Sequence, residues 1–315
     1  MKSIAIWYEP IENNLESVND IELHFNLWKI PNGTKNAHKF LDIGLKLANT
    51  ENLSCLKIYF PTIIATSDFE DIVGKFIDKP DLVSAIFNEN YNVKLNSTSK
   101  FNEIRDIDNN FIFNIYKSSI TDISFENNFE GTIVTINLPK QEQRIYLRYR
   151  IKGEFINSLS TISKPTNAIL ESAFSEIEMI DFRVNEIRDL NLSLLESINK
   201  KLLKIEKLHF FFICSNDEEV VGNHQPFLSC RNLENYRWNN YVDLPNTDKQ
   251  IYLAYHWKEK LKESVSILIK SKYERNNLKT IFKYAVFALI VAVAIELFSN
   301  WLYDVMKGIL TYKCN

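Results

Sequence analysis

An apolar segment close to the C-terminus constrains this chain more than any other feature. Residues 281–303 read IFKYAVFALIVAVAIELFSNWLY, with a long apolar run bordered by only a few polar residues. A helix of about 20 mostly apolar residues crosses about 30 Å of hydrocarbon. Trp301 and Tyr303 lie near one end, where amphipathic rings favour the lipid headgroups. The segment therefore predicts a transmembrane helix over 281–303; the alternative is a buried core helix, which Lys283 and Glu296 leave open.

Basic residues are concentrated on one side of this segment. From Lys258 to Lys283 the sequence has eight Lys and Arg residues against three Glu residues. Positive charge usually flanks the cytoplasmic side of a span, and the N-terminal sequence MKSIAIWYEP lacks the features of a signal peptide. The abundance of Asn, Lys and Ile is typical of an AT-rich bacterial genome. We therefore expect a single-pass protein of the bacterial inner membrane with a cytoplasmic N-terminal part and a short outer tail over 304–315.

The sequence before the span is patterned mostly as strands. Short stretches rich in β-branched and aromatic residues, often alternating with polar ones, recur along it. The predicted strands are 21–30, 41–47, 56–60, 111–116, 131–138, 144–151, 180–185, 208–214 and 251–257. Helical spacing of apolar residues occurs at 68–77, 81–87 and 190–208, and a helical stalk is predicted over 259–280. We therefore predict a mainly β (α+β) fold, followed by a helical stalk and one C-terminal transmembrane helix.

An internal repeat suggests how the β-rich part is divided. Residues 136–152 read INLPKQEQRIYLRYRIK and residues 242–258 read VDLPNTDKQIYLAYHWK, which align without gaps and share seven residues. A repeat of this length is typical of a duplicated supersecondary unit. We therefore predict two related β-rich modules, 1–156 and 157–258. The alternative is a pair of similar hairpins within one domain.

The first repeated segment has a strongly basic face. Successive side chains of a strand point to opposite faces, and each residue adds about 3.4 Å. Arginines at this spacing can meet successive phosphates through paired hydrogen bonds, and a tyrosine between them could stack on a base. The sequence therefore predicts a binding face for a nucleotide or single-stranded oligonucleotide; the alternative is a solvated face paired with carboxylates. The residues of this face are Arg144, Tyr146, Arg148, Arg150 and Lys152.

Small and polar residues follow one stripe of the predicted transmembrane helix. Small residues let helices approach closely, and polar ones bridge them. An ionisable residue within a span is a functional candidate, and rings of acidic side chains favour the passage of cations. We therefore predict a homo-oligomer that forms an ion channel; the alternative is that the acidic residue only marks the end of the span. The stripe comprises Ala285, Ala288, Ala292, Glu296, Ser299 and Asn300.

No catalytic or cofactor motif is present in the sequence. Glycine is scarce, with 7 residues in 315, and neither G-x-G-x-x-G nor a P-loop occurs. The sequences G-x-S-x-G, H-E-x-x-H and Cys-x-x-Cys are also absent. Cys214, His224 and Cys230 are too loosely spaced for a zinc site with an evident fourth ligand. We therefore expect no enzymatic activity, no cofactor and no bound metal; an anchored hydrolase with an unrecognised site is the alternative.

The layout resembles that of membrane-anchored effectors of bacterial anti-phage defence systems, the Hailong-type transmembrane effector in particular. The resemblance rests on the β-rich part, the basic strand Arg144–Lys152 and the span that contains Glu296. It implies a cytoplasmic sensing domain, gated by a DNA oligomer, that controls a transmembrane part which disrupts the membrane. The alternative function is a membrane-anchored adaptor whose β modules bind a protein partner, for example at a strand edge.

The predicted span has a direct consequence for the full-length protein. Because about 20 apolar residues hold a chain in lipid far more strongly than a peripheral contact does, we expect it to sediment with membranes. It should resist a high-salt wash that removes peripheral proteins, and it should enter the supernatant only with detergent. Ultracentrifugation of lysed cells with immunoblotting measures this. Full-length protein in the detergent-free supernatant would contradict the prediction of a span over 281–303.

Overall fold

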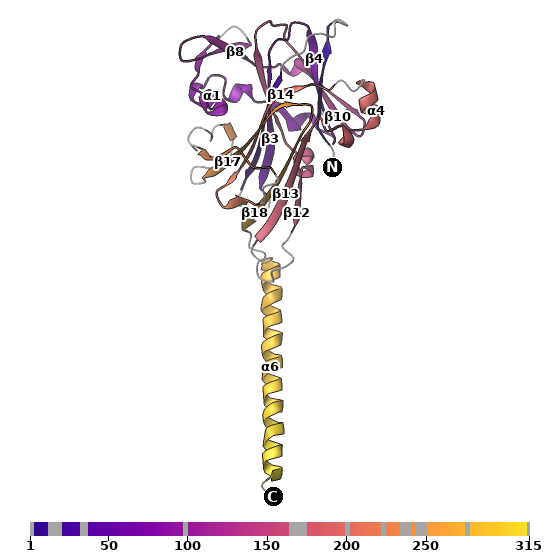
Figure 1. Ribbon diagram of the computed structural model, residues 1–315, viewed down its shortest axis with the longest axis vertical. Coiled ribbons are helices and arrows are strands. Elements are labelled where there is room, and N and C mark those ends of the chain that lie inside the picture. The colour runs from indigo at the N-terminus through magenta and orange to yellow at the C-terminus, as the bar shows by residue number, and fades with distance from the viewer. Residues whose placement is uncertain are drawn as a thin grey trace. The chain divides into compact units, whose positions relative to one another are not determined.

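The structure is a computed structural model of the 315-residue chain, and its described residues fall into two compact units. Those residues are 3–11, 21–31, 37–96, 100–163, 175–198, 202–221, 225–233, 238, 241–242, 251–274 and 278–313. One unit, which we call the β domain, comprises Met1–Thr161 and Glu178–Ser271; the C-terminal unit comprises Ile162–Ile177 and Lys272–Asn315. Strands make up most of the β domain, and the C-terminal unit contains one long helix (Figure 1). The predicted mainly β fold with one C-terminal apolar helix is confirmed.

The β domain is organised around a ten-stranded sheet. Its path runs β16 (Ser229–Leu233), β17 (Tyr252–Lys262), β14 (Ile205–Ser215), β2 (Ile21–Ile30), β3 (His38–Leu47), β11 (Ile145–Ile151), β8 (Phe111–Tyr116), β7 (Phe101–Arg105) and β6 (Asn92–Lys94), and β5 (Phe69–Asp71) also pairs with β11. Neighbouring strands are antiparallel along most of the path, but β14 runs parallel to β2 and β11 runs parallel to β8. Strands far apart in the sequence therefore lie next to one another.

Two four-stranded sheets complete the strand arrangement. One has the order β1 (Ala5–Pro10), β4 (Leu53–Phe60), β10 (Gly131–Asn137) and β9 (Ile123–Asn128). The other has the order β12 (Ser160–Ser163), β13 (Ser175–Val184), β18 (Val265–Glu274) and β15 (Glu218–Val220). The short α-helices are α1 (Pro80–Phe87), α2 (Glu154–Ser158) and α4 (Leu192–Ser197), and the 3-10 turns include η1 (Thr66–Asp68) and η2 (Val73–Lys75).

Both faces of the central part of the ten-stranded sheet are covered by other parts of the chain. On the first face, side chains such as Phe25 and Phe210 pack in one core with residues of the four-stranded sheets. On the second face, Trp28 and Phe40 pack in another core with α1 and η2. The central part of the sheet therefore has little solvent-facing surface, and all seven residues of β11 are buried.

The basic face predicted for residues 144–152 is therefore wrong in its middle section. Arg148 and Arg150 are each 1% exposed. Arg150 donates from Nε to Asp42 Oδ1 at 2.7 Å and from Nη2 to Asp42 Oδ2 at 3.2 Å. Arg148 donates to the hydroxyls of Tyr241 and Tyr146, each at 2.7 Å. We call this group of five residues the arginine network; it stabilises the interior and presents no open face to a polyanion.

Glycine at position 44 allows the arginine network to form. Gly44 lies directly opposite Arg148 in the pairing of β3 with β11. A Cβ atom there would lie 2.1 Å from the hydroxyl oxygen of Tyr146, the group that accepts a hydrogen bond from Arg148. Any larger residue would displace that hydroxyl, so the glycine is required by the close approach of a side chain.

The predicted helices are confirmed in one case and wrong in three. Helix α1 confirms the helical spacing at 81–87. Residues 68–77 form the end of η1, strand β5 and the turn η2, and the described residues of 190–208 contain only the short α4 before β14 begins. The predicted stalk over 259–280 is mostly the end of β17 and strand β18, with a helix beginning at Leu278.

The apolar residues around the predicted stalk fit two periods, which explains that error. A helical stripe would bury Leu261, Val265 and Leu268, but Leu261 is 84% exposed in the structure. Burial instead follows the period of a strand, at Val265, Ile267 and Ile269.

The two predicted modules are not separate in the structure. Strands β2, β3 and β11 come from residues 1–156, and β14 and β17 come from residues 157–258, yet all five lie in the same sheet. The repeated segments contribute β11 and β17, each antiparallel to a neighbour in that sheet. The structure therefore agrees with the alternative in placing both repeats within one domain, although the first repeat is not a hairpin, because β10 and β11 lie in different sheets.

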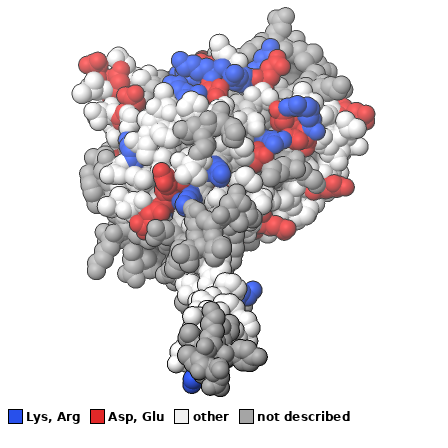
Figure 2. All heavy atoms as spheres, turned by 60° about the horizontal axis from the view of Figure 1, so that its bottom comes forward, with Lys and Arg blue, Asp and Glu red and all other residues white. Residues whose placement is uncertain are grey.

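Helix α6 (Leu278–Lys313) is the long helix of the C-terminal unit. Within its segment Ile281–Lys307, the most apolar 18-residue window has a mean hydropathy of 2.3 and none of that window is buried within the chain, so the helix could span a membrane. The described part of the helix in the foreground of Figure 2 consists almost entirely of uncharged residues. The helix continues well past residue 303, so most of the predicted tail over 304–315 is helical.

The arginine network makes a prediction about stability. Removal of one partner from a buried ion pair leaves an uncompensated charge, which costs about 3–5 kcal/mol. Asp42→Ala should therefore lower the free energy of unfolding by about that amount, measured by urea denaturation of the detergent-solubilised full chain with tryptophan fluorescence. Glu103→Ala is the control, because Glu103 pairs with Arg105 at a partly exposed site and should cost about 1 kcal/mol or less. Equal effects of the two variants would contradict a structural role for the network.

Candidate functional site

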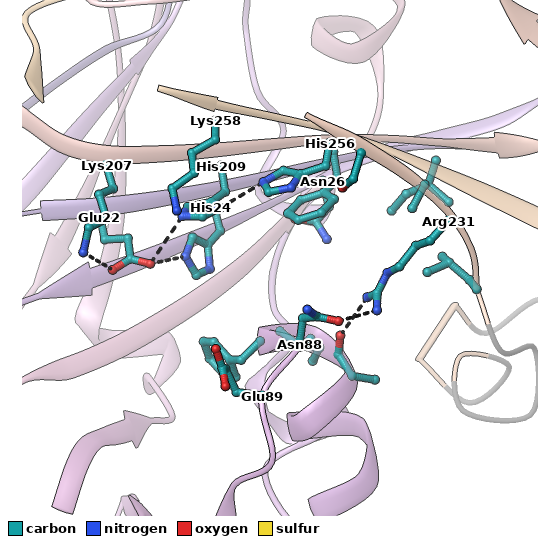
Figure 3. A pocket seen from close by; sticks show the side chains of 18 of the residues that line it. Glu22, His24, Asn26, Asn88, Glu89, Lys207, His209, Arg231, His256 and Lys258 are labelled. Carbon is teal, nitrogen blue, oxygen red and sulfur yellow. Dashed lines mark hydrogen bonds and ion pairs between the residues drawn. The ribbon is translucent and has the colours of Figure 1, made fainter. Parts of the chain in front are cut away.

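A cavity of about 390 Å³ lies in the β domain, on the second face of the ten-stranded sheet. Strands β2, β3, β14 and β17 provide its floor, and β16, the end of α1 and Trp238 line its sides (Figure 3). Its volume falls in the range of small-molecule sites, about 300–1,000 Å³. The cavity is therefore large enough for a small organic ligand.

Strand pairing brings the polar side chains of the floor together. Residues directly opposite one another on adjacent strands point to the same face of a sheet. The paired rows that reach the cavity are Lys207–Glu22–Lys46, Lys258–His209–His24 and His256–Phe211–Asn26. The register of four strands thus gathers basic, imidazole and amide groups at one place.

Glu22 is the centre of an interacting cluster on this floor. Its Oε1 lies 3.0 Å from His24 Nε2 and 3.7 Å from His209 Nε2. Its Oε2 faces two ammonium groups, at 3.5 Å from Lys46 Nζ and 3.9 Å from Lys207 Nζ. One carboxylate oxygen therefore serves imidazoles and the other serves lysines, as the dashed lines in Figure 3 partly show.

The carboxylate is ionised and the imidazoles are neutral at physiological pH. Burial acts to raise the pKa of Glu22, but the hydrogen bond to His24 and the nearby positive charges lower it below its ordinary value. Burial, with the repulsion that a protonated His24 would exert, lowers the pKa of His209 to about 3. Burial, with the charge of Lys258, lowers the pKa of His256 to about 4. Positive charge in the cavity therefore comes from lysine and arginine side chains.

A third imidazole and an aromatic ring extend the cluster along β14 and β17. His209 Nδ1 and His256 Nε2 are 3.0 Å apart, so one of them donates to the other. The ring of His256 stacks on Phe211, with 4.3 Å between centroids and an angle of 5° between planes. These flat groups form an apolar and polarisable part of the wall, against which a planar ligand could pack.

One basic side chain of the wall has a structural partner. Arg231 of β16 donates to Asn88 Oδ1 and to the backbone oxygen of Ala85, at the C-terminal end of α1. Asn88 has a φ of 55° and ends the helix, a position where asparagine is favoured. Arg231 therefore holds α1 beside the cavity, and its charge also complements the helix dipole.

Asn26 is a buried residue with one side-chain atom that lacks a hydrogen-bond partner within the described part of the chain. It is 6% exposed and lines the cavity, and its Oδ1 has no hydrogen-bond partner among the described residues. An unpaired buried polar atom costs about 1–3 kcal/mol. Such a group beside a cavity indicates a site where a ligand or a water molecule supplies the missing hydrogen bond.

The residues predicted to bind ligand are divided between surface and interior. Arg144 is exposed, and Lys152 is partly exposed with its Nζ 3.6 Å from Glu70 Oε2. Tyr146, Arg148 and Arg150 belong to the arginine network. That network lies on the same face of the sheet as the cavity, because Asp42 pairs with Asn26 across β3 and β2.

The residues predicted to form a pore or helix contact all lie on α6. Their spacing of three and four residues places them along one side of the helix, and all are exposed in the single chain. They are Ala285, Ala288, Ala292, Glu296, Ser299 and Asn300. Glu296 lies two residues past the midpoint of Ile281–Lys307, so the longer apolar segment brings it to about 3 Å from the centre.

Sequence reasoning missed the residues of the cavity floor. The stretch IELHFNLW contains Glu22, His24 and Asn26 at alternate positions, which is a visible signal of a polar strand face. His209 and His256 lie on other strands, and their approach depends on a parallel pairing that no local pattern encodes. An alternating Glu-His-Asn face in an otherwise apolar strand was therefore the one usable clue.

Comparisons with known proteins leave the family open. No family model matches the chain, and no curated protein matches its sequence significantly. One solved structure, the yeast delta-COP-I mu-homology domain complexed with a Dsl1 WxWxV peptide, matches at 10% identity over 83% of this chain and 76% of that chain. The TM-score is 0.20, which is too low to carry an argument about fold or function.

Proposed function

We propose that this chain is a single-span membrane effector whose β domain binds a small anionic ligand, a nucleotide or a short single-stranded oligonucleotide. The binding site in this proposal is the cavity on the second face of the ten-stranded sheet, and it replaces the β11 face expected from the sequence. The observation that carries the proposal is a basic cavity with the buried Asn26 on its floor, whose Oδ1 has no hydrogen-bond partner among the described residues.

The charge of the cavity lining favours an anion. Four basic residues line it, Lys46, Lys207, Lys258 and Arg231, against two acidic ones, Glu22 and Glu89. Lys258 is exposed and has no ion-pair partner among the described residues, so its ammonium group is available to a phosphate. Like charges in a partly enclosed site also attract an oppositely charged ligand during approach.

The shape and the aromatic lining favour a ligand with a planar ring. Phe211, His256, Phe87 and Trp238 contribute flat surfaces to the cavity. Stacking of a base on an aromatic side chain is worth about 1–3 kcal/mol and tolerates different bases. A nucleotide combines the planar ring and the phosphate that these two sets of side chains fit.

Control of the membrane by the ligand requires two states of the protein. A ligand can shift such an equilibrium only when it binds the two states with different affinity. The stripe of small and polar residues on α6 supports self-association, and near-central Glu296 supports a route for cations. The β domain would face the cytoplasm of a bacterium in this proposal, and the anti-phage role that the layout resembles stays a prediction.

Ligand binding can be measured with the detergent-solubilised full chain. Titration calorimetry against mononucleotides, cyclic nucleotides, dinucleotides and short oligonucleotides should reveal a binder in the micromolar range or tighter. Lys258→Glu should weaken that binding about tenfold or more, because it reverses an available charge at the cavity. Lys140→Glu is the matched control, since Lys140 is exposed and lies outside the cavity lining. Absence of binding by every member of the set, or equal binding by both variants, would refute the proposed site.

The role of the span is tested separately by exchange of residues 281–307 for an unrelated transmembrane helix. Ligand binding should be unchanged, because the cavity lies in the β domain. Ligand-dependent ion flux from liposomes should be lost, because the Glu296 stripe is removed. Glu296→Gln should reduce cation flux without loss of membrane insertion. Full biological activity of the exchanged chain would favour the adaptor function, in which the span is only an anchor.

A further inference from the structure

We propose that Glu22, His24 and His209 form a binding site for one divalent transition metal ion of the zinc class. The three ligand atoms are the carboxylate Oε1 of Glu22 and the Nε2 atoms of the two imidazoles. The site goes beyond the proposed function and does not rest on it, because metal binding needs no nucleotide.

The geometry of the three atoms suits one small cation. All three lie within 4.8 Å of one another. Zinc takes imidazole nitrogen at about 2.0–2.1 Å and carboxylate oxygen at about 2.0–2.2 Å, which puts tetrahedral ligand atoms about 3.4 Å apart. The distances from Glu22 Oε1 to His24 Nε2 and His209 Nε2 are 3.0 and 3.7 Å. Rotations of the imidazole rings that bring all three atoms to that separation would close the site.

Three strand residues hold the ligand atoms in place. Glu22 and His24 are separated by one residue on β2, and His209 lies directly opposite His24 on β14. His24 is buried and Glu22 and His209 are partly buried. Ligands on paired strands of a sheet are better fixed than ligands on loops.

His256 acts as an outer partner of the site. Metal binding at His209 Nε2 requires the proton of that ring to sit on Nδ1, and Nδ1 lies 3.0 Å from His256 Nε2. In that arrangement His209 Nδ1–H donates to His256, which orients the ring and raises its basicity. The hydrogen bond from His24 to Glu22 in the metal-free protein is replaced on binding, when the His24 proton moves to its own Nδ1.

The lysines around Glu22 favour an anion at the open position of the metal. Lys46 and Lys207 face Oε2, the oxygen that does not bind the metal, and hold the carboxylate in orientation. Their charge weakens binding of a cation and attracts an anion. The fourth ligand position faces the cavity, where water or an anionic group such as a phosphate or carboxylate completes the coordination.

The test uses the purified full chain, stripped of metal with a chelator. Titration with Zn²⁺ should show one site per chain, and Co²⁺ should give the intense visible absorption of a tetrahedral complex. Glu22→Gln and His209→Ala should each lose the stoichiometric site and the cobalt spectrum. His256→Ala should weaken zinc binding about 10–100-fold while keeping the spectrum.

The control variant is His38→Ala, which removes a histidine of β3 that is not part of the cluster and should bind zinc as the unmodified chain does. Circular dichroism of each variant verifies that it is folded. If the ligand variants fail to fold, the zinc titration and the cobalt spectrum of the unmodified chain still test the proposal. The absence of a stoichiometric zinc site in that chain would overturn it. An octahedral cobalt spectrum that Glu22→Gln leaves unchanged would also overturn it. Because no nucleotide is present, its failure is distinguishable from failure of the proposed function.

Discussion

Burial of both faces of the central part of the ten-stranded sheet is the constraint on which the rest of the β domain depends. A sheet with one solvent-facing side can leave polar side chains in water, but the buried part of this sheet cannot. Every polar residue that is buried on its second face must find a partner inside the protein or leave a buried group unsatisfied. The arginine network and the cavity floor are two places on this face where buried polar side chains pair with one another.

The two polar groups on this face meet the requirement in different ways. In the arginine network, Asp42 and the hydroxyls of Tyr146 and Tyr241 accept hydrogen bonds from two nitrogens of each guanidinium group. Arg148 Nη2 has no hydrogen-bond partner among the described residues, but it lies 3.9 Å from Asp42 Oδ2. The residues of the network do not line the cavity, so their role is structural. On the cavity floor the partners are fewer, since Asn26 keeps an unpartnered oxygen and the imidazoles gather around one carboxylate oxygen. Incomplete satisfaction beside open space is what distinguishes a candidate binding site from a core.

The strand register links the two groups. Asn26 of the cavity floor lies opposite Asp42 of the network, and His24 lies opposite Gly44, over which the Tyr146 hydroxyl sits. A change in the network would therefore shift residues next to the cavity through β3, because side chains of this strand belong to both the network and the cavity lining. Arg148 and Arg150, which the sequence predicted to bind a ligand, instead hold β3 in place beside the cavity from the neighbouring strand β11.

Local patterns in the sequence determined the parts of this protein that depend on local physics. The apolar run before residue 304 predicted an exposed helix that could cross a membrane, because length and hydropathy suffice for that. Alternating β-branched and aromatic residues predicted the β class. Only the tertiary structure decided which polar strand faces are exposed to solvent. Arg150 meets Asp42 from 108 residues away, and His209 meets Glu22 through a parallel pairing. Side-chain alternation specifies two faces of a strand, but burial of a face depends on what distant segments pack against it.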